Sequence, residues 1–261
     1  MGLDIYAGHL TRYYSRNWEN MTQQLTKKSG ERYVMLDGDG NEIKPMVNTD
    51  EIEQIRDTIN LWADTLAAKF DPPLPTPLWN EKDECGYYSD NPGWEAYGAL
   101  VMLQACRCLN RPLPEFVEIG WNAYDEPVVN ETMSRKIVNS ILAAGCWLPI
   151  SEKALIMTAM PTGDDATIST VPLLKQELEE LNQQLWQADE ETILSWRNEK
   201  YYVPIIEEHE EQKLVLGFIR RKKIIQKEKY RTEDLAQCAF SILYQAMKFA
   251  TEQHVPILLD Y

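Results

Sequence analysis

The sequence predicts an α+β fold that is dominated by helices, with short strands at both termini and one or two hairpins. Helices are indicated by apolar residues that recur every three or four positions over long stretches. Strands are indicated at residues 3–8 and 255–259, two short segments in which most residues are apolar. Helices between terminal strands are typical of an α+β domain, and we expect the two end strands to pair.

Each predicted helix begins or ends at a recognisable signal. The first covers residues 11–29 and ends at Gly30, a residue suited to a left-handed C-terminal cap. The second follows Asn48, which forms a capping box with Glu51, and places its apolar side chains on one stripe. Further helices are predicted to begin at Pro92, to cover residues 133–144, to run from Thr170 to Leu185, to cover residues 190–197, and to run from Thr232 to Ala250.

Two hairpins and one internal strand are predicted between the helices. Residues 37–41 read Asp-Gly-Asp-Gly-Asn, which tolerate positive φ and favour a tight turn. Residues 154–160 predict a strand that ends in a turn at 161–164. The segment 201–230 fits either one charged helix or a hairpin, with strands at 201–206 and 214–219 around an acidic tip. β-Branched and aromatic residues on both sides of the tip favour the hairpin.

The chain is predicted to form one globular domain over residues 1–261. Its proline-rich segment, residues 71–77, holds four prolines and is expected to be an extended, stiff connector. This segment is the candidate boundary between two subdomains, and a loop that crosses a single domain is the alternative.

The net charge of the chain indicates which classes of partner it can bind. The formal net charge of −15 argues against nucleic acid, because binding a polyanion requires Lys and Arg to neutralise its phosphates. It favours a basic protein partner, or it serves solubility alone. No stretch approaches the ~20 apolar residues that a membrane-spanning helix needs, and no secretory signal is apparent. We therefore expect a cytoplasmic protein that binds neither membrane nor nucleic acid.

The sequence contains none of the usual catalytic, metal or cofactor motifs. It has no glycine-rich phosphate loop and no nucleophile elbow, and its three histidines lack metal-ligand spacing. The loop at 37–41 lacks the Gly and Glu that a calcium loop has at its sixth and twelfth positions. Adjacent acids such as Asp164 and Asp165 are too common in an acidic chain to indicate catalysis. We therefore expect no metal and no cofactor, and we expect the five cysteines to be free thiols.

A segregated run of charges is the first candidate binding site. If 201–230 is a hairpin, its acidic tip and basic stem lie apart, and such a charge distribution steers association with a partner. Neutralisation of each charge by a neighbour is the alternative. The candidate residues are Glu207, Glu208, Glu210 and Glu211 in the acidic run, and Arg220, Arg221, Lys222 and Lys223 in the basic run.

A second candidate site lies near the N-terminus. Polar and aromatic side chains gather at a predicted strand-to-helix turn, where a helix N-terminus favours a bound anion. Simple aromatic packing and ion pairing explain the same residues. The candidate ligands of a small anionic substrate are Asp4, Tyr6, His9 and Arg12, in a stretch that also holds Tyr13, Tyr14 and Arg16.

Both ends of the chain carry a resemblance. A group of uncharacterised bacterial proteins of about this length is similar in the opening GLDIYAG, the TRYY that follows it, the final VPILLDY, and the helix entry at residues 168–170. The resemblance implies a bacterial origin and transfers no activity.

These observations favour a binding protein over an enzyme. The 8 Trp and 13 Tyr are residue types enriched at binding hot spots. We expect an immunity-type protein that neutralises a bacterial toxin, its cognate partner, by covering the active site. An enzyme of unrecognised motif acting through the N-terminal candidates is the first alternative. A regulatory subunit that docks through residues 207–231 is the second.

Overall fold

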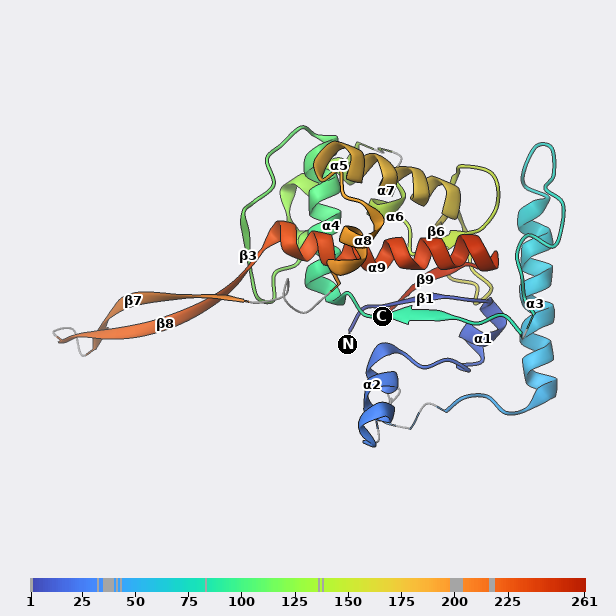
Figure 1. The fold of residues 1–261 in the computed structure, drawn as a ribbon, viewed down its shortest axis with the longest axis horizontal. Coiled ribbons are helices and arrows are strands. Elements are labelled where there is room, and N and C mark those ends of the chain that lie inside the picture. Colours follow the sequence, from blue (N-terminus) through green and yellow to red (C-terminus); the bar gives the residue numbers. More distant parts are fainter. Residues whose placement is uncertain are drawn as a thin grey trace. The chain divides into compact units, whose positions relative to one another are not determined.

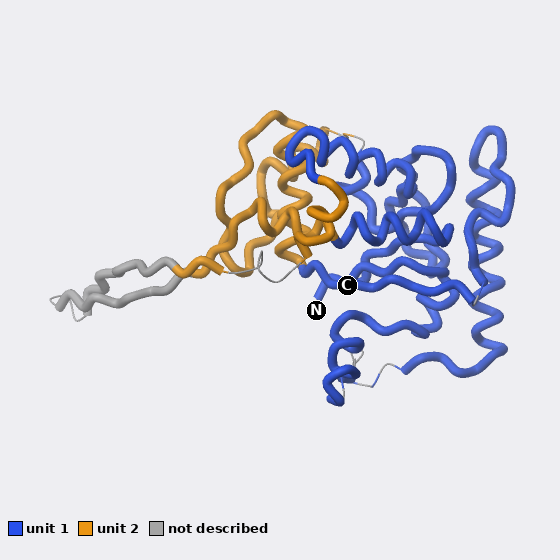
Figure 2. The backbone as a smooth tube through the Cα atoms, viewed as in Figure 1, with its two compact units in different colours: residues 1–93, 138–188, 242–261 blue, residues 94–137, 189–241 orange. Residues whose placement is uncertain are grey.

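The computed structural model divides the chain into two compact units, and each is assembled from separate stretches of sequence (Figure 2). Unit 1 comprises residues 1–93, 138–188 and 242–261, and unit 2 comprises residues 94–137 and 189–241. The proline-rich segment 71–77 lies inside unit 1 and does not separate the two units. The structure describes all residues except 1, 32, 35–39, 41, 43, 83, 136, 138, 198–203 and 216–218, and it does not describe the side chains of 207–227.

Unit 1 is built on a six-stranded mixed sheet, so the α+β class is confirmed (Figure 1). Its neighbouring strands pair antiparallel, except that β4 and β6 run parallel. The sheet holds more strands than the two end segments and residues 154–160 predict. In spatial order the strands are β2 (Tyr88–Asp90), β1 (Asp4–Ala7), β9 (Ile257–Asp260), β4 (Cys146–Leu148), β6 (Asp165–Thr170) and β5 (Leu155–Ala159).

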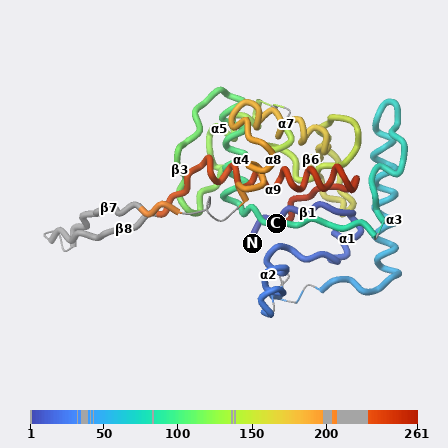
Figure 3. Tube along the Cα trace, viewed as in Figure 1, coloured from blue at the N-terminus to red at the C-terminus, as the bar shows by residue number. Residues whose placement is uncertain are grey.

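The two terminal strands pair with each other in the middle of this sheet, as the sequence predicts. Asp4 lies opposite Asp260, and Tyr6 lies opposite Leu258, in an antiparallel register. Figure 3 shows the blue N-terminal strand beside the red C-terminal one. Every residue of β1 is buried, including Asp4, whose carboxylate accepts hydrogen bonds from Asn20 and Asn91.

Helices of unit 1 follow their sequence signals with two corrections. Asn48 caps the helix after it, but its side chain accepts from the Asp50 N–H and donates to Glu51, so the predicted capping box is not formed. The single helix predicted over 11–29 is two helices, because Arg16 adopts a left-handed conformation (φ 58°) and Asn20 begins a new helix with a capping box to Gln23. Gly30 caps the second helix with φ 78°, as predicted. The helices of unit 1 are α1 (Leu10–Tyr14), α2 (Met21–Ser29), α3 (Thr49–Ala67), α6 (Ser140–Ala143), α7 (Val171–Leu185) and the second part of α9 (Thr232–Gln253).

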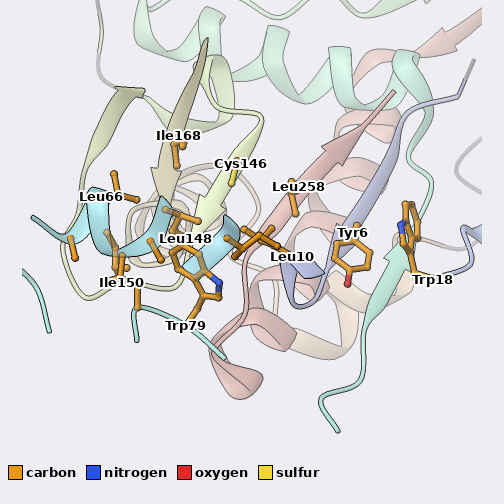
Figure 4. Packing of buried hydrophobic residues seen from close by; sticks show 14 residues of the cluster. Tyr6, Leu10, Trp18, Leu66, Trp79, Cys146, Leu148, Ile150, Ile168 and Leu258 are labelled. Carbon is orange, nitrogen blue, oxygen red and sulfur yellow. The ribbon is translucent and has the colours of Figure 1, made fainter. Parts of the chain in front are cut away.

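One hydrophobic cluster of unit 1 lies between the sheet, α1 and α3 (Figure 4). Tyr6 is fully buried, and its ring lies 4.9 Å from that of Trp18 and 5.3 Å from that of Tyr13. Aromatic pairs at these distances add to the free energy of burial. Gly8 leaves the space that Tyr6 fills, since a Cβ on Gly8 would lie only 2.4 Å from the Tyr6 hydroxyl. A glycine is therefore required beside this ring.

Unit 2 packs around α4, in which every residue from Ala96 to Cys106 is buried. The Trp196 ring meets the Phe240 ring edge-on at 5.8 Å. The helix predicted over 133–144 is wrong: one helix ends at Ser134, and α6 of unit 1 begins at Ser140. The elements of unit 2 are α4 (Gly93–Cys108), β3 (Phe116–Glu118), the 3₁₀ turn η1 (Ala123–Asp125), α5 (Pro127–Ser134), α8 (Glu190–Ser195), β7 (Ile205–Val215), β8 (Ile219–Arg231) and the first part of α9 (Thr232–Gln253).

The described residues of segment 201–230 form two paired strands rather than one helix, although these strands, at 205–215 and 219–231, are longer than the predicted 201–206 and 214–219. β7 and β8 pair antiparallel along their length, and β8 also pairs with β3 at Lys229, Tyr230 and Arg231. The sheet order β3-β8-β7 leaves β7 at an edge. The hairpin predicted around residues 37–41 falls largely outside the described residues.

Candidate functional site

Two neighbouring cavities in unit 1 form the candidate site. One has a volume of about 440 Å³ and lies between the ends of α1 and β9 and the start of β6. The other has a volume of about 510 Å³ and lies along α3. Tyr14 and Thr162 line both cavities, so they adjoin. We call the pair the acidic groove, because three aspartates line its first cavity.

A tight turn presents two of these aspartates at the start of β6. The Met160 N–H donates to the Asp164 carbonyl at 2.8 Å, and Gly163 takes a left-handed conformation (φ 92°). Asp164 and Asp165 are both exposed. Neither takes part in an ion pair with any residue that the structure describes. Two uncompensated negative charges therefore face solvent at the rim.

The third aspartate, Asp260, is held by residues of α1 and the turn after it. The Tyr13 hydroxyl donates to Asp260 Oδ1 at 2.6 Å, and Arg16 Nη1 lies 3.5 Å from the same oxygen. The Arg16 guanidinium lies over the Tyr13 ring, 5.7 Å from its centroid. Arg16 partly neutralises Asp260, so the groove keeps an excess of negative charge.

Hydroxyl and thiol groups of the groove stay protonated at neutral pH. Burial, followed by the charge of Asp260, raises the pKa of Tyr13. Burial, followed by Cys146 and Asp164, raises the pKa of Tyr14. Burial raises the pKa of the Cys146 thiol to about 12, so this cysteine is not an activated nucleophile. The groove thus offers hydrogen-bond donors and carboxylates rather than an activated catalytic group.

The second cavity supplies an apolar surface next to these carboxylates. Ile55 and Ile59 of α3 line it together with Met46 and Pro161. Glu51 lines its wall and accepts a hydrogen bond from Asn48 Nδ2 at 3.0 Å. A cationic group beside an apolar one, as in a basic peptide segment, matches both halves of the groove.

The residues of the N-terminal candidate site are buried or half-buried and make hydrogen bonds within unit 1. Asp4, Tyr6 and His9 are 7%, 0% and 2% exposed. Asp4 accepts hydrogen bonds from Asn91 and Asn20, and burial, the first of several causes, raises its pKa. The Tyr6 hydroxyl donates to the His9 carbonyl at 3.0 Å. These groups line neither cavity of the groove, and nothing in their geometry favours an anionic substrate.

His9 and Arg12 hold the N-terminal end of α1 in place. His9 Nδ1 accepts a hydrogen bond from the Arg12 backbone N–H at 3.1 Å and so caps this helix. Arg12 Nη1 donates to the Cys85 carbonyl, and its guanidinium lies 5.5 Å from the centre of the Tyr87 ring. Both side chains of this pair are thus committed to contacts within unit 1.

Glu81 completes this arrangement and was not singled out from the sequence. Its Oε1 accepts from the Leu10 N–H at 2.8 Å, and its Oε2 accepts from the Thr11 N–H at 2.9 Å and the Thr11 hydroxyl at 2.7 Å. The Trp79 indole N–H donates to Oε1 at 2.7 Å. These bonds use the unpaired donors of the first turn of α1, which is the role of a cap supplied from a distant loop.

The charged candidates of segment 201–230 lie in the strands of the hairpin, and the predicted separation of an acidic tip from a basic stem is wrong. Glu207 lies opposite Lys227, and Glu211 lies opposite Lys223. Both strands therefore extend through the charged run. The eight candidates are Glu207, Glu208, Glu210 and Glu211 in β7, and Arg220, Arg221, Lys222 and Lys223 in β8; their side chains lie outside the described residues.

The chain matches no protein-family model, no curated protein and no solved structure. Within the part of the chain that the structure describes, no helix combines the length and the apolarity needed to cross a bilayer. No cluster of three or more His, Cys, Asp or Glu among those residues is arranged to hold a metal ion.

Proposed function

We propose that the chain is a protein-binding module that takes a basic protein partner in the acidic groove. The observation that carries this proposal is the lining of the groove by Asp164, Asp165 and Asp260 beside an apolar cavity of about 510 Å³. An arginine or lysine of the partner enters between the carboxylates, and an apolar neighbour of that residue fills the cavity along α3. The net charge of −15 steers the encounter with a basic partner.

An immunity-type protein is the form of this function that we propose. Such a protein neutralises a bacterial toxin by covering the toxin's active site. The protonated hydroxyl of Tyr14 supports a binding role, since it supplies a hydrogen-bond donor on a rigid aromatic ring.

Neutralising the two rim aspartates tests the proposal. The partner to be used is the protein encoded by the adjacent gene, purified and titrated calorimetrically against this chain. We expect the double variant Asp164→Asn/Asp165→Asn to weaken binding by about tenfold or more, because it removes two uncompensated charges from the contact surface. We also expect the affinity of the unmodified chain to fall as salt rises, since screening shortens the range of the attraction.

The matched control is Asp57→Asn/Asp64→Asn. These two exposed residues of α3 line neither cavity, and their replacement changes the net charge by the same amount. Equal weakening by the two double variants would show that net charge acts without the groove. Lack of binding by the adjacent gene's product, or a toxin that stays active in the complex, contradicts the immunity role.

A further inference from the structure

Unit 2 holds a cavity whose wall is chiefly aromatic. Its volume is about 410 Å³, and Trp94, Trp121 and Tyr124 contribute three rings to it. Glu95 and Asn122 are the polar side chains of its lining. Trp94 is 40% exposed, so the cavity is accessible from solvent. The acidic groove of unit 1 involves none of these residues.

Trp121 is fixed in place by its turn and by its indole nitrogen. Gly120 follows β3 in a left-handed conformation (φ 77°), and the Trp121 N–H donates to the Glu118 carbonyl at 3.1 Å. The Trp121 indole N–H donates to Glu126 Oε1 at 2.6 Å. The edge of the ring is therefore anchored, which leaves its face to line the cavity.

Gly98 and Asn122 set the distance between the helix and the other rings. Gly98 lies one turn after Trp94, and a Cβ there would lie 3.1 Å from the Ala123 Cβ and 3.5 Å from Trp121. The missing side chain thus lets Trp121 approach α4 closely. Asn122 Oδ1 accepts from the Tyr124 N–H at 3.1 Å and holds Tyr124 on η1.

Electrostatically, the cavity favours a positive charge. Glu95 is charged, and no Lys or Arg lines the cavity in the described part of the chain. Glu95 lies in the first turn of α4, where its charge offsets the positive end of the helix dipole. The face of each aromatic ring is itself electron-rich and attracts a cation, most strongly in tryptophan.

We propose that this cavity binds an alkylated ammonium group, with its methyl groups against Trp94, Trp121 and Tyr124 and its charge near Glu95. A bare lysine ammonium is strongly hydrated, and the cavity offers few acceptors to replace that water. Methyl groups spread the charge and fill an aromatic-lined space at a lower cost of desolvation. The group comes either from a free small molecule of the choline type or from a methylated lysine of another protein.

Paired ligands that differ only in charge test the proposal with the full chain. Choline is titrated against 3,3-dimethylbutan-1-ol, its uncharged counterpart of the same shape, by saturation-transfer NMR and calorimetry. We expect choline to bind at least about tenfold more tightly, the size of a cation–π attraction in a partly desolvated site. A peptide with trimethyl-lysine is compared with the same peptide carrying unmodified lysine. Choline binding alone identifies a free small molecule, peptide binding alone identifies a modified protein, and either supports the site.

Variants place the binding in this cavity. Trp94→Leu is expected to weaken binding of the methylated cation by about tenfold, and Glu95→Gln by a smaller factor of about threefold. The matched control is Trp186→Leu, a half-buried tryptophan of unit 1 outside the cavity, which should leave binding unchanged. Thermal unfolding of each variant checks that it folds. If Trp94→Leu does not fold, Glu95→Gln still tests the site. The proposal is overturned if the uncharged counterpart binds as tightly as choline, or if no methylated cation binds at millimolar concentration.

Discussion

Replacing Glu81 by alanine is expected to lower the free energy of unfolding by about 3–5 kcal/mol at neutral pH. The carboxylate accepts from two backbone N–H groups of α1, from the Thr11 hydroxyl and from the Trp79 indole. These donors are largely buried, so the variant leaves them without acceptors in a place that water does not easily reach. Urea denaturation measures the loss. Glu84→Ala, an exposed acid of the same loop, is the matched control and should change stability by less than about 0.5 kcal/mol.

Acid should reduce the effect of the Glu81 substitution. Burial raises the pKa of Glu81, but the hydrogen bonds from Thr11 and Leu10 oppose it, and the net pKa lies below the ordinary 4.5. A carboxyl whose pKa is lower in the folded state stabilises above its unfolded pKa, and this stability is lost as pH falls through the folded pKa. The difference between wild type and Glu81→Gln should therefore shrink below pH 4.5. A difference independent of pH in that range would contradict the carboxylate's role.

The sequence predicted correctly those helix ends and strands that depend on interactions between residues close together in the chain. Asn48 caps the start of α3, Gly30 caps the end of α2, and both caps act through neighbours within four residues. The hairpin was predicted from β-branched residues around a charged run. Its register was missed, because the pairing of Glu211 with Lys223 depends on which residues form the turn.

The acidic groove could not be predicted, since it joins residues that are distant in the chain. Asp165 and Asp260 lie on strands of one sheet, but the order β9-β4-β6 that brings them together follows from long-range pairing. Tyr13, Tyr14 and Arg16 were noted in a stretch rich in polar and aromatic residues. Their alignment with Asp260 depends on the break at Arg16 that the single predicted helix omitted.

The aromatic cavity of unit 2 could not be predicted from the sequence either, although its residues lie closer together in the chain. Trp94 stands at helical spacing with other apolar residues, a pattern that predicts core packing, yet its side chain is 40% exposed. The signal that was available is Gly120 followed by Trp121, a turn glycine next to a large ring. That signal alone does not predict a cavity, because Trp121 can lie close to α4 only where Gly98, in a different element, has no side chain.

Replacing Glu177 is expected to cause the second large loss of stability, and the contribution of this residue to stability depends on pH in the opposite direction to that of Glu81. This residue of α7 is 6% exposed, and it accepts from the Ser140 N–H at 2.8 Å, the Ser140 hydroxyl at 2.6 Å and the Ile141 N–H at 3.2 Å. It thus caps α6 as Glu81 caps α1. We expect Glu177→Ala to lower the free energy of unfolding by about 3 kcal/mol, because these buried donors lose their acceptor. Glu179→Ala, an exposed acid on the same helix, is the matched control for denaturation.

Burial outweighs the hydrogen bonds at Glu177, so its pKa is raised above 4.5, whereas that of Glu81 is lowered. A carboxyl whose pKa is higher in the folded state contributes stability that is present below its unfolded pKa and lost as pH rises through the folded pKa. Glu177→Gln keeps one acceptor oxygen and removes the titrating group. We expect it to lower the free energy of unfolding by about 1–2 kcal/mol, because its amide NH₂ would face the Ser140 N–H, which is also a donor. Unfolding free energies measured upward from pH 4 should therefore show wild type losing stability relative to Glu177→Gln, while wild type gains relative to Glu81→Gln. Parallel pH curves for wild type and Glu177→Gln would mean that burial does not control this carboxyl.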